Sequence, residues 1–225
     1  CPCEVTALKN YIGHTEEKLF TIDFVCLGAN SPLAFNAYKA DLEKRYHSDI
    51  TCIWFKNKKY SWNRFSTLVT FKNGKKYQKD RYSDPYMRCY IERQLLIRPS
   101  CQKCLFKGLP HGADLTLADF WGVEKVIPGI DSKHGVSLVS ANSEKGMRLI
   151  SSAETRLYIR KVDEKSYAKN PMLQQCPVLE NDTDSFYDDM KKDGFMMAAH
   201  RHLPYDAAYY LRRTYRAIRI RLLGR

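Results

Sequence analysis

Two cysteines separated by two residues, Cys101 and Cys104, form the sharpest chemical feature of the sequence. This spacing lets both sulfurs bind one metal, because the chain turns back on itself over so short a span. Such pairs serve zinc sites, iron–sulfur clusters and thioredoxin-type redox centres. A thioredoxin motif should lie between a strand and the helix that it opens. Here the pair follows Pro99 and leads into Phe106-Lys-Gly-Leu-Pro110, so we favour a metal site.

A metal centre needs two more ligands, and Cys3 and Cys26 are the best candidates. Cys3 precedes a predicted helix and Cys26 ends a predicted strand. Strand ends and helix N-termini are places where sulfur ligands can converge, and the helix dipole also favours thiolate. The spacing alone does not separate an iron–sulfur cluster from zinc. Cys52, inside a predicted strand, and Cys89, within a predicted helix, are expected to be small buried hydrophobic residues.

The elements that must position these residues form a mixed α/β pattern. Ser31 followed by Pro32 predicts a helix to Tyr46, and Asn73-Gly74 predicts the turn of a hairpin. Asn142 or Ser143 should cap a later helix. Predicted strands cover 19–26, 50–55, 65–71, 75–78, 115–120, 135–141 and 157–162, and the other helices cover 5–12, 84–96 and most of the chain after 164.

The fold class is therefore mixed α/β, with a compact sheet-and-helix core and a helical C-terminal tail. A composition shift near residues 155–165 predicts a core domain over 1–155 and a mostly helical, basic extension over 156–225. The 225 residues are 44% hydrophobic, which excludes a disordered chain. No apolar run reaches the roughly 18 residues of a membrane span, and no signal peptide is recognisable. Because the sequence begins with Cys1, we expect it to be a fragment or a processed form.

The net charge of +12 is concentrated in two segments. Residues 56–81 hold nine basic side chains and one acid, and residues 201–225 hold seven arginines and one acid. Either segment could meet a phosphorylated cofactor, nucleic acid or a lipid surface, or could be a solvated face. In the last predicted helix one face carries arginines and the other is apolar; these residues are Arg212, Arg216 and Arg219, and Leu211, Tyr215, Ile218 and Leu222. Such a helix could lie on an anionic membrane, but docking of its apolar face on the domain is favoured.

Six segments in order along residues 1 to about 150 resemble the C-terminal portion of the coenzyme F(420) hydrogenase/dehydrogenase beta-subunit family. They include Asp23-Phe-Val-Cys26, Arg98-Pro-Ser-Cys-Gln-Lys-Cys104 and Asp114-Leu-Thr-Leu-Ala-Asp-Phe-Trp-Gly122, and the ordered set is more specific than any one motif. The others are Pro2-Cys-Glu-Val5, Asp84-Pro-Tyr-Met-Arg88 and Gly135-Val-Ser-Leu-Val139. Members of this family are iron–sulfur flavoproteins that reduce or oxidise a deazaflavin coenzyme or related acceptors.

The resemblance implies that Cys3, Cys26, Cys101 and Cys104 bind a 4Fe–4S cluster and that FAD lies nearby. It also implies a redox partner, or the family's N-terminal ferredoxin-like region, which this sequence does not contain. Part of the flavin site is then expected to be missing. The family's usual His after the second cysteine is replaced by Leu27, which puts redox tuning or acceptor choice in doubt.

Three further residues are candidates for cofactor binding. Asp119 and Trp121 end a predicted strand, where α/β sheets place ligands, although a turn-capping Asp and a core Trp are the plainer alternatives. Lys107 could neutralise cluster or phosphate charge, but lysines on the surface are more common. His111 has no partner at metal-ligand spacing and is expected on the surface or in a turn. No general acid or base can be assigned.

The leading hypothesis is a cytoplasmic iron–sulfur, flavin-dependent oxidoreductase, or its cluster-bearing C-terminal part, which transfers electrons between a 4Fe–4S cluster, FAD and a deazaflavin-like or unknown acceptor. The alternative is a zinc-stabilised basic binding domain without redox activity. A nucleic-acid binder ranks lowest, because no nucleic-acid-binding motif accompanies the basic charge, and nucleic acid is not an expected partner. Peripheral contact with an anionic membrane through the C-terminal helix is the other candidate interaction.

Overall fold

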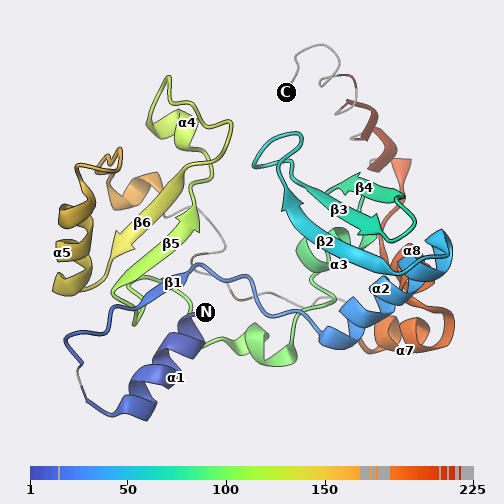
Figure 1. Cartoon of the computed structure of the whole chain (residues 1–225), viewed down its shortest axis with the longest axis horizontal. Coiled ribbons are helices and arrows are strands. Elements are labelled where there is room, and N and C mark those ends of the chain that lie inside the picture. Colours follow the sequence, from blue (N-terminus) through green and yellow to red (C-terminus); the bar gives the residue numbers. More distant parts are fainter. Residues whose placement is uncertain are drawn as a thin grey trace. The chain divides into compact units, whose positions relative to one another are not determined.

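The computed structural model describes residues 1–14, 16–167, 173, 176, 183–207, 209–211, 213–215 and 218. Helices and strands are mixed along the chain, and the C-terminal region is helical, which confirms the expected fold class (Figure 1). The chain divides into two compact units, each made of two segments. Unit 1 comprises Cys1–Leu27 and Lys103–Cys176, and unit 2 comprises Gly28–Gln102 and Pro177–Arg225.

Unit 1 is built on a three-stranded sheet in the order β1-β5-β6. The strands are β1 (Ile22–Phe24), β5 (Leu115–Asp119) and β6 (Ser137–Ala141). β1 runs parallel to β5, whereas β5 and β6 are antiparallel. The helical segments of this unit are α1 (Pro2–Ile12), α4 (Val123–Val126), α5 (Glu144–Ala153) and the short η2 (Glu164–Ser166). A small apolar core of Phe120, Val123, Ile127 and Leu138 lies beyond the end of β5.

A buried carboxylate, Asp114, joins the elements of unit 1 just before β5. Its oxygens accept hydrogen bonds from the backbone N–H and hydroxyl of Thr21, each at 2.8 Å, and from the hydroxyl of Ser143 at 2.6 Å. Ser143 is also the N-cap of α5, as expected. Burial acts to raise the pKa of Asp114, but the hydrogen bonds from Ser143 and Thr21 outweigh it and lower the pKa to about 2.

Unit 2 contains an antiparallel sheet in the order β2-β3-β4. Its strands are β2 (Ile50–Asn57), β3 (Ser66–Phe71) and β4 (Lys76–Asp80), with the expected Asn73-Gly74 turn between the last two. Its helical segments are α2 (Pro32–Tyr46), α3 (Pro85–Ile91), α7 (Thr183–Asp193) and α8 (Phe195–His202). The short helix η1 (Pro99–Lys103) lies at the boundary between the two units.

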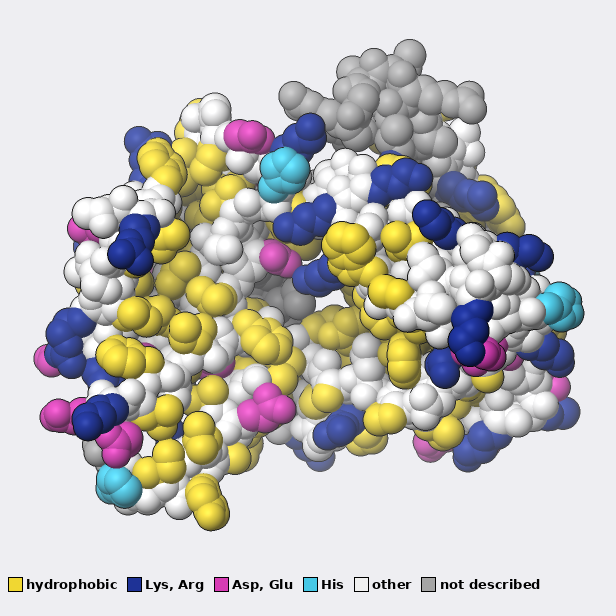
Figure 2. All heavy atoms as spheres, viewed as in Figure 1, with side chains coloured by type: hydrophobic (Ala, Val, Ile, Leu, Met, Phe, Trp, Pro, Cys, Tyr) yellow, Lys and Arg dark blue, Asp and Glu magenta, His cyan; other side chains and the backbone are white. Residues whose placement is uncertain are grey.

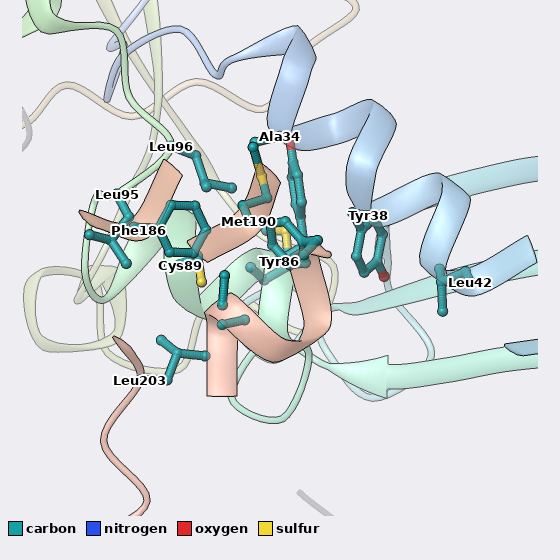
Figure 3. Packing of buried hydrophobic residues seen from close by; sticks show 14 of the residues in the cluster. Ala34, Tyr38, Leu42, Tyr86, Cys89, Leu95, Leu96, Phe186, Met190 and Leu203 are labelled. Carbon is teal, nitrogen blue, oxygen red and sulfur yellow. The ribbon is translucent and has the colours of Figure 1, made fainter. Parts of the chain in front are cut away.

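The core of unit 2 is rich in aromatic and sulfur-containing side chains. Figure 3 shows Tyr38 of α2 and Tyr86 of α3 beside Phe186 and Met190 of α7. Asp84, the buried N-cap of α3, accepts hydrogen bonds from the Tyr38 hydroxyl at 2.9 Å and the Tyr77 hydroxyl at 2.7 Å. Burial raises the pKa of Asp84 above its usual value, so these donors satisfy a carboxyl that is costly to ionise.

Three local expectations are wrong. Residues 157–162 form no strand, and most of them are exposed. Helix α3 ends at Ile91 instead of 96, because Gln94 adopts a left-handed conformation with φ of 54° and turns the chain. Cys52 is exposed on β2, whereas Cys89 is fully buried as expected. Among the described residues, no helix combines the length and the apolar character that a membrane span requires.

Candidate metal centre

The four candidate ligands are free thiols that lie in or beside short elements. Cys3 is exposed in the first turn of α1, one residue inside the helix that it was expected to precede. Cys26 follows β1, Cys101 lies in η1 and Cys104 comes directly after η1; all three are half-buried. Pro2 fixes the start of α1, because proline is preorganised for the first helical position.

Two contacts tie the segment that carries Cys104 to the strand that leads to Cys26. The Lys107 ammonium donates a hydrogen bond to the carbonyl oxygen of Cys26. Four residues later, His111 Nδ1 lies 3.0 Å from the carboxylate of Asp23 in β1. The two ties join residues that are 81 and 88 positions apart in the sequence, and they hold both sulfur-bearing segments of unit 1 against one sheet.

Asp23 and His111 form a buried polar pair that the sequence did not reveal. The side chain of His111 is only 5% exposed, so its expected place on the surface is wrong. Asp23 also accepts a 2.6 Å hydrogen bond from the Thr116 hydroxyl, which in turn accepts one from the Asn142 amide at 2.8 Å. The only signal in the sequence is Asp23 itself, since an acidic residue inside an apolar strand needs a buried partner.

Cys101 lies against a backbone loop of unit 2. The N–H of Ala29 donates a hydrogen bond to Cys101 Sγ over 3.5 Å. Gly28, with φ of 146°, makes this approach possible, because a Cβ there would lie 2.5 Å from Ile97 Cγ2 and 3.3 Å from Cys101 Cβ. Hydrogen bonds to cysteine sulfur are among the contacts that tune metal–sulfur centres.

The three other candidate residues lie near the carboxyl end of β5 or beside Cys26. Because β1 and β5 are parallel, their carboxyl ends, where Cys26 and Asp119 lie, are at the same end of the sheet. Asp119 is exposed, and Trp121 is 40% exposed, which excludes Trp121 from the hydrophobic core. Lys107 contacts the backbone of Cys26 and is half-buried, so it is not a freely solvated lysine. The structure therefore gathers Cys26, Lys107 and Asp119 around one edge of unit 1.

Cysteine sulfurs are suitable metal ligands, but the four candidates are divided between the two units. Cys3, Cys26 and Cys104 belong to unit 1, whereas Cys101 belongs to unit 2. Within the part of the chain that the structure describes, no three His, Cys, Asp or Glu side chains are grouped closely enough to hold a metal ion. Four cysteine sulfurs without a disulfide bond fit both an iron–sulfur cluster and zinc in their chemistry.

Residues 1–166 match the family model that describes the C terminus of the coenzyme F420 hydrogenase/dehydrogenase beta subunit. This match covers all four candidate ligands, together with Lys107, Asp119 and Trp121. Neither the curated proteins nor the solved structures provided a match to the chain.

Proposed function

Because the chain belongs to the family defined by the C terminus of the coenzyme F420 hydrogenase/dehydrogenase beta subunit, a family associated with redox function, we propose that it is the iron–sulfur, flavin-binding part of an oxidoreductase. The acceptor in this proposal is a deazaflavin or a related two-electron carrier. The observation that carries it is the pair of ties, Lys107 to the Cys26 carbonyl and His111 to Asp23, which hold two sulfur-bearing segments at one sheet edge.

The proposed ligands of a 4Fe–4S cluster are Cys3, Cys26, Cys101 and Cys104. Cys3 is held in the first turn of α1, and the Ala29 N–H donates a hydrogen bond to Cys101 Sγ. Lys107, whose ammonium lies on the carbonyl of Cys26, adds positive charge beside a centre that would carry net negative charge. These residues bind and orient; none of them is assigned a proton-transfer role.

FAD is proposed to lie near the same edge. A flavin accepts a hydride as two electrons, and an iron–sulfur cluster transfers electrons one at a time, so the two groups must be adjacent. Trp121, with its partly exposed ring, is suited to pack against a flat aromatic ligand, and Asp119 to accept a hydrogen bond from it. Lys107 is the third proposed contact.

The cysteine set is tested by anaerobic purification of the longest form of the protein, followed by analysis for iron, sulfide, zinc and flavin. We expect a brown protein with a broad absorption band near ~400 nm that bleaches with dithionite. Replacing Cys26 or Cys101 by Ser should remove most of the iron. The matched control is Cys52→Ser, because Cys52 is an exposed thiol on the sheet of unit 2.

A colourless protein that carries stoichiometric zinc would overturn this proposal in favour of a zinc-stabilised binding domain without redox activity. The same cysteine substitutions would then remove zinc and lower the stability of the fold. We place the activity in the cytoplasm, because all eight cysteines are free and free thiols persist in a reducing compartment.

A further inference from the structure

In the part of the chain that the structure describes, the outward face of the sheet in unit 2 carries exposed side chains, among them Cys52, Trp54 and Lys76. Strand register places Trp54, Leu68 and Gln78 in one row across the three strands, and Cys52, Thr70 and Lys76 in the next. The opposite face packs into the core through Ile53, Val69 and Tyr77. The ring of Trp54 is 53% exposed. We call this surface the Trp54 face; its members are Cys52, Trp54, Leu68, Thr70, Lys76 and Gln78.

A hydrogen-bonded network fixes the polar side chains beside Trp54. The Gln78 amide nitrogen donates to the Ser66 hydroxyl at 3.0 Å and approaches Asn57 Oδ1 at 3.3 Å. The Lys59 ammonium donates to the Gln78 amide oxygen at 3.1 Å, which holds this lysine at the margin of the face. Side chains that are ordered in advance lose less conformational entropy when a partner binds, so this network favours recognition.

The Trp54 face carries Lys76, and Lys59 lies at its margin. Both belong to residues 56–81, which hold nine basic side chains and one acid. Within this segment Arg64 pairs with Asp80, Lys72 pairs with Asp49, and Lys79 lies opposite Thr67 on the core side of the sheet. Figure 2 shows Lys and Arg side chains distributed over the part of the molecule that carries this sheet, with hydrophobic side chains between them. Such a field attracts acidic partners and accelerates their encounter.

The composition of the face indicates a protein partner. A single aromatic side chain at the centre with lysines at the margin is the usual anatomy of a protein interface. Single-stranded nucleic acid is generally bound by several aromatic platforms in succession, whereas among the paired residues of β2, β3 and β4 Trp54 is the one aromatic side chain on this face. Its rows also contain Thr70, Gln78 and Lys76, whose polar groups are poorly suited to insertion into lipid.

The size of the face indicates a transient complex. Three strands about 4.8 Å apart and five residues long at about 3.4 Å each cover roughly 250 Å². A stable complex buries about 800 Å² on each partner, whereas electron-transfer encounters lie at the small end of the range. We propose that the Trp54 face docks a small acidic electron-carrier protein; its identity as an electron carrier rests on the proposed function.

Binding is tested by calorimetry at low ionic strength, with an oxidised plant-type ferredoxin as the acidic probe, so that no electron moves. We expect Trp54→Ala and the double variant Lys59→Glu/Lys76→Glu each to weaken binding at least about ten-fold, and added salt to weaken it in the unaltered protein. The control is Lys125→Glu/Lys133→Glu, which makes the same charge change at exposed positions of unit 1 and should weaken binding less than about two-fold.

Equal weakening by both charge variants would overturn the proposal, because net charge would then account for binding without the Trp54 face. Absence of binding, or a Trp54→Ala variant that binds normally, would also overturn it. An oligothymidylate that binds more tightly than ferredoxin and is lost in Trp54→Ala would assign the face to nucleic acid instead. Since the readout needs no cluster, binding by a colourless protein would contradict only the proposed function.

Discussion

At the scale of single residues, three buried carboxylates show how this chain makes acidic side chains tolerable in its interior. Asp84 is placed at a helix N-terminus with two tyrosine hydroxyls, and burial raises its pKa. Asp23 is paired with His111 and Thr116. The hydrogen bonds to Asp114 lower its pKa, so the ionised form of this carboxylate stabilises the fold.

The Asp114→Asn variant is expected to lose stability in a pH-dependent way. The folded-state pKa of about 2 lies below the ordinary 3.8, so the ionised carboxylate contributes roughly 2 kcal/mol above pH 4 to 5, and this contribution disappears as the pH falls toward 2. Urea unfolding at several pH values measures the difference between variant and parent. Asp131→Asn, at an exposed position, is the control. A difference that stays constant with pH would show that the charge of Asp114 contributes nothing.

His111 is expected to act as a positioning residue for the proposed cluster. In His111→Ala the Asp23 carboxylate loses a donor and the segment after Cys104 loses one of its ties to β1, so iron should be released several-fold faster to a chelator. His111→Asn, which can still donate to Asp23, should restore part of the retention. His134→Ala, at an exposed position, serves as the control. Unchanged iron release with reduced stability to urea would assign His111 a structural role only.

At the scale of elements, α5 packs closely against Asp114, the residue that precedes β5. A Cβ on Gly146 would lie 2.1 Å from the carbonyl oxygen of Asp114, a backbone atom that cannot move aside. Gly146→Ala should therefore lower the free energy of unfolding by about 1–3 kcal/mol. Gly112→Ala is the matched control, because its nearest neighbour would be Thr6 Oγ1 at 3.5 Å. Equal urea midpoints for the two variants would contradict the clash.

The elements that the sequence predicts well are those with local signals. Ser31 and Pro32 begin α2, Asn73-Gly74 closes the β3–β4 hairpin and Ser143 caps α5, because capping and turn formation depend on a few adjacent residues. The failures depend on distant partners. Residues 157–162 have strand composition but gain no neighbouring strand, and Cys52 is exposed because its side of β2 is the open one.

In the candidate site, too, the sequence indicates the residues that have a local signal and misses those that depend on distant partners. Spacing identified Cys101 and Cys104 as a pair of metal ligands, and this role stays a prediction. The buried pair of Asp23 and His111 could not be foreseen, because the two residues are 88 positions apart and neither forms a local motif with the other. The assignment of the four cysteines to one cluster stays a prediction.

At the scale of the whole molecule, composition and contacts describe the chain differently. The division into 1–155 and 156–225 follows a change of composition along the sequence and stays a prediction. Contacts instead group residues 1–27 with 103–176, and 28–102 with 177–225. The four candidate cysteine ligands therefore come from segments that are far apart in the sequence. The basic segments 56–81 and 201–225 both belong to unit 2.

The C-terminal segment is predicted to bind anionic membranes. Leu211, Tyr215 and Ile218 are 71%, 65% and 51% exposed, so these three side chains do not dock on the domain as expected. Four other residues of the predicted amphipathic helix lie outside the described residues. They are the arginines of its basic face, Arg212, Arg216 and Arg219, and the apolar Leu222. Exposed apolar side chains next to arginines bind best to a surface that offers both acyl chains and negative charge.

Sedimentation with phosphatidylglycerol vesicles should therefore capture the protein, and phosphatidylcholine vesicles should not. Leu211→Asp/Ile218→Asp should abolish capture, because each acid repels the lipid and removes apolar area. Leu105→Asp/Leu157→Asp is the control, with two exposed leucines of unit 1. The Lys59→Glu/Lys76→Glu variant separates the two basic segments: it should lose the acidic protein probe yet still bind vesicles. Equal loss of vesicle binding in all three variants would mean that binding depends on the net charge of the protein and not on the C-terminal segment.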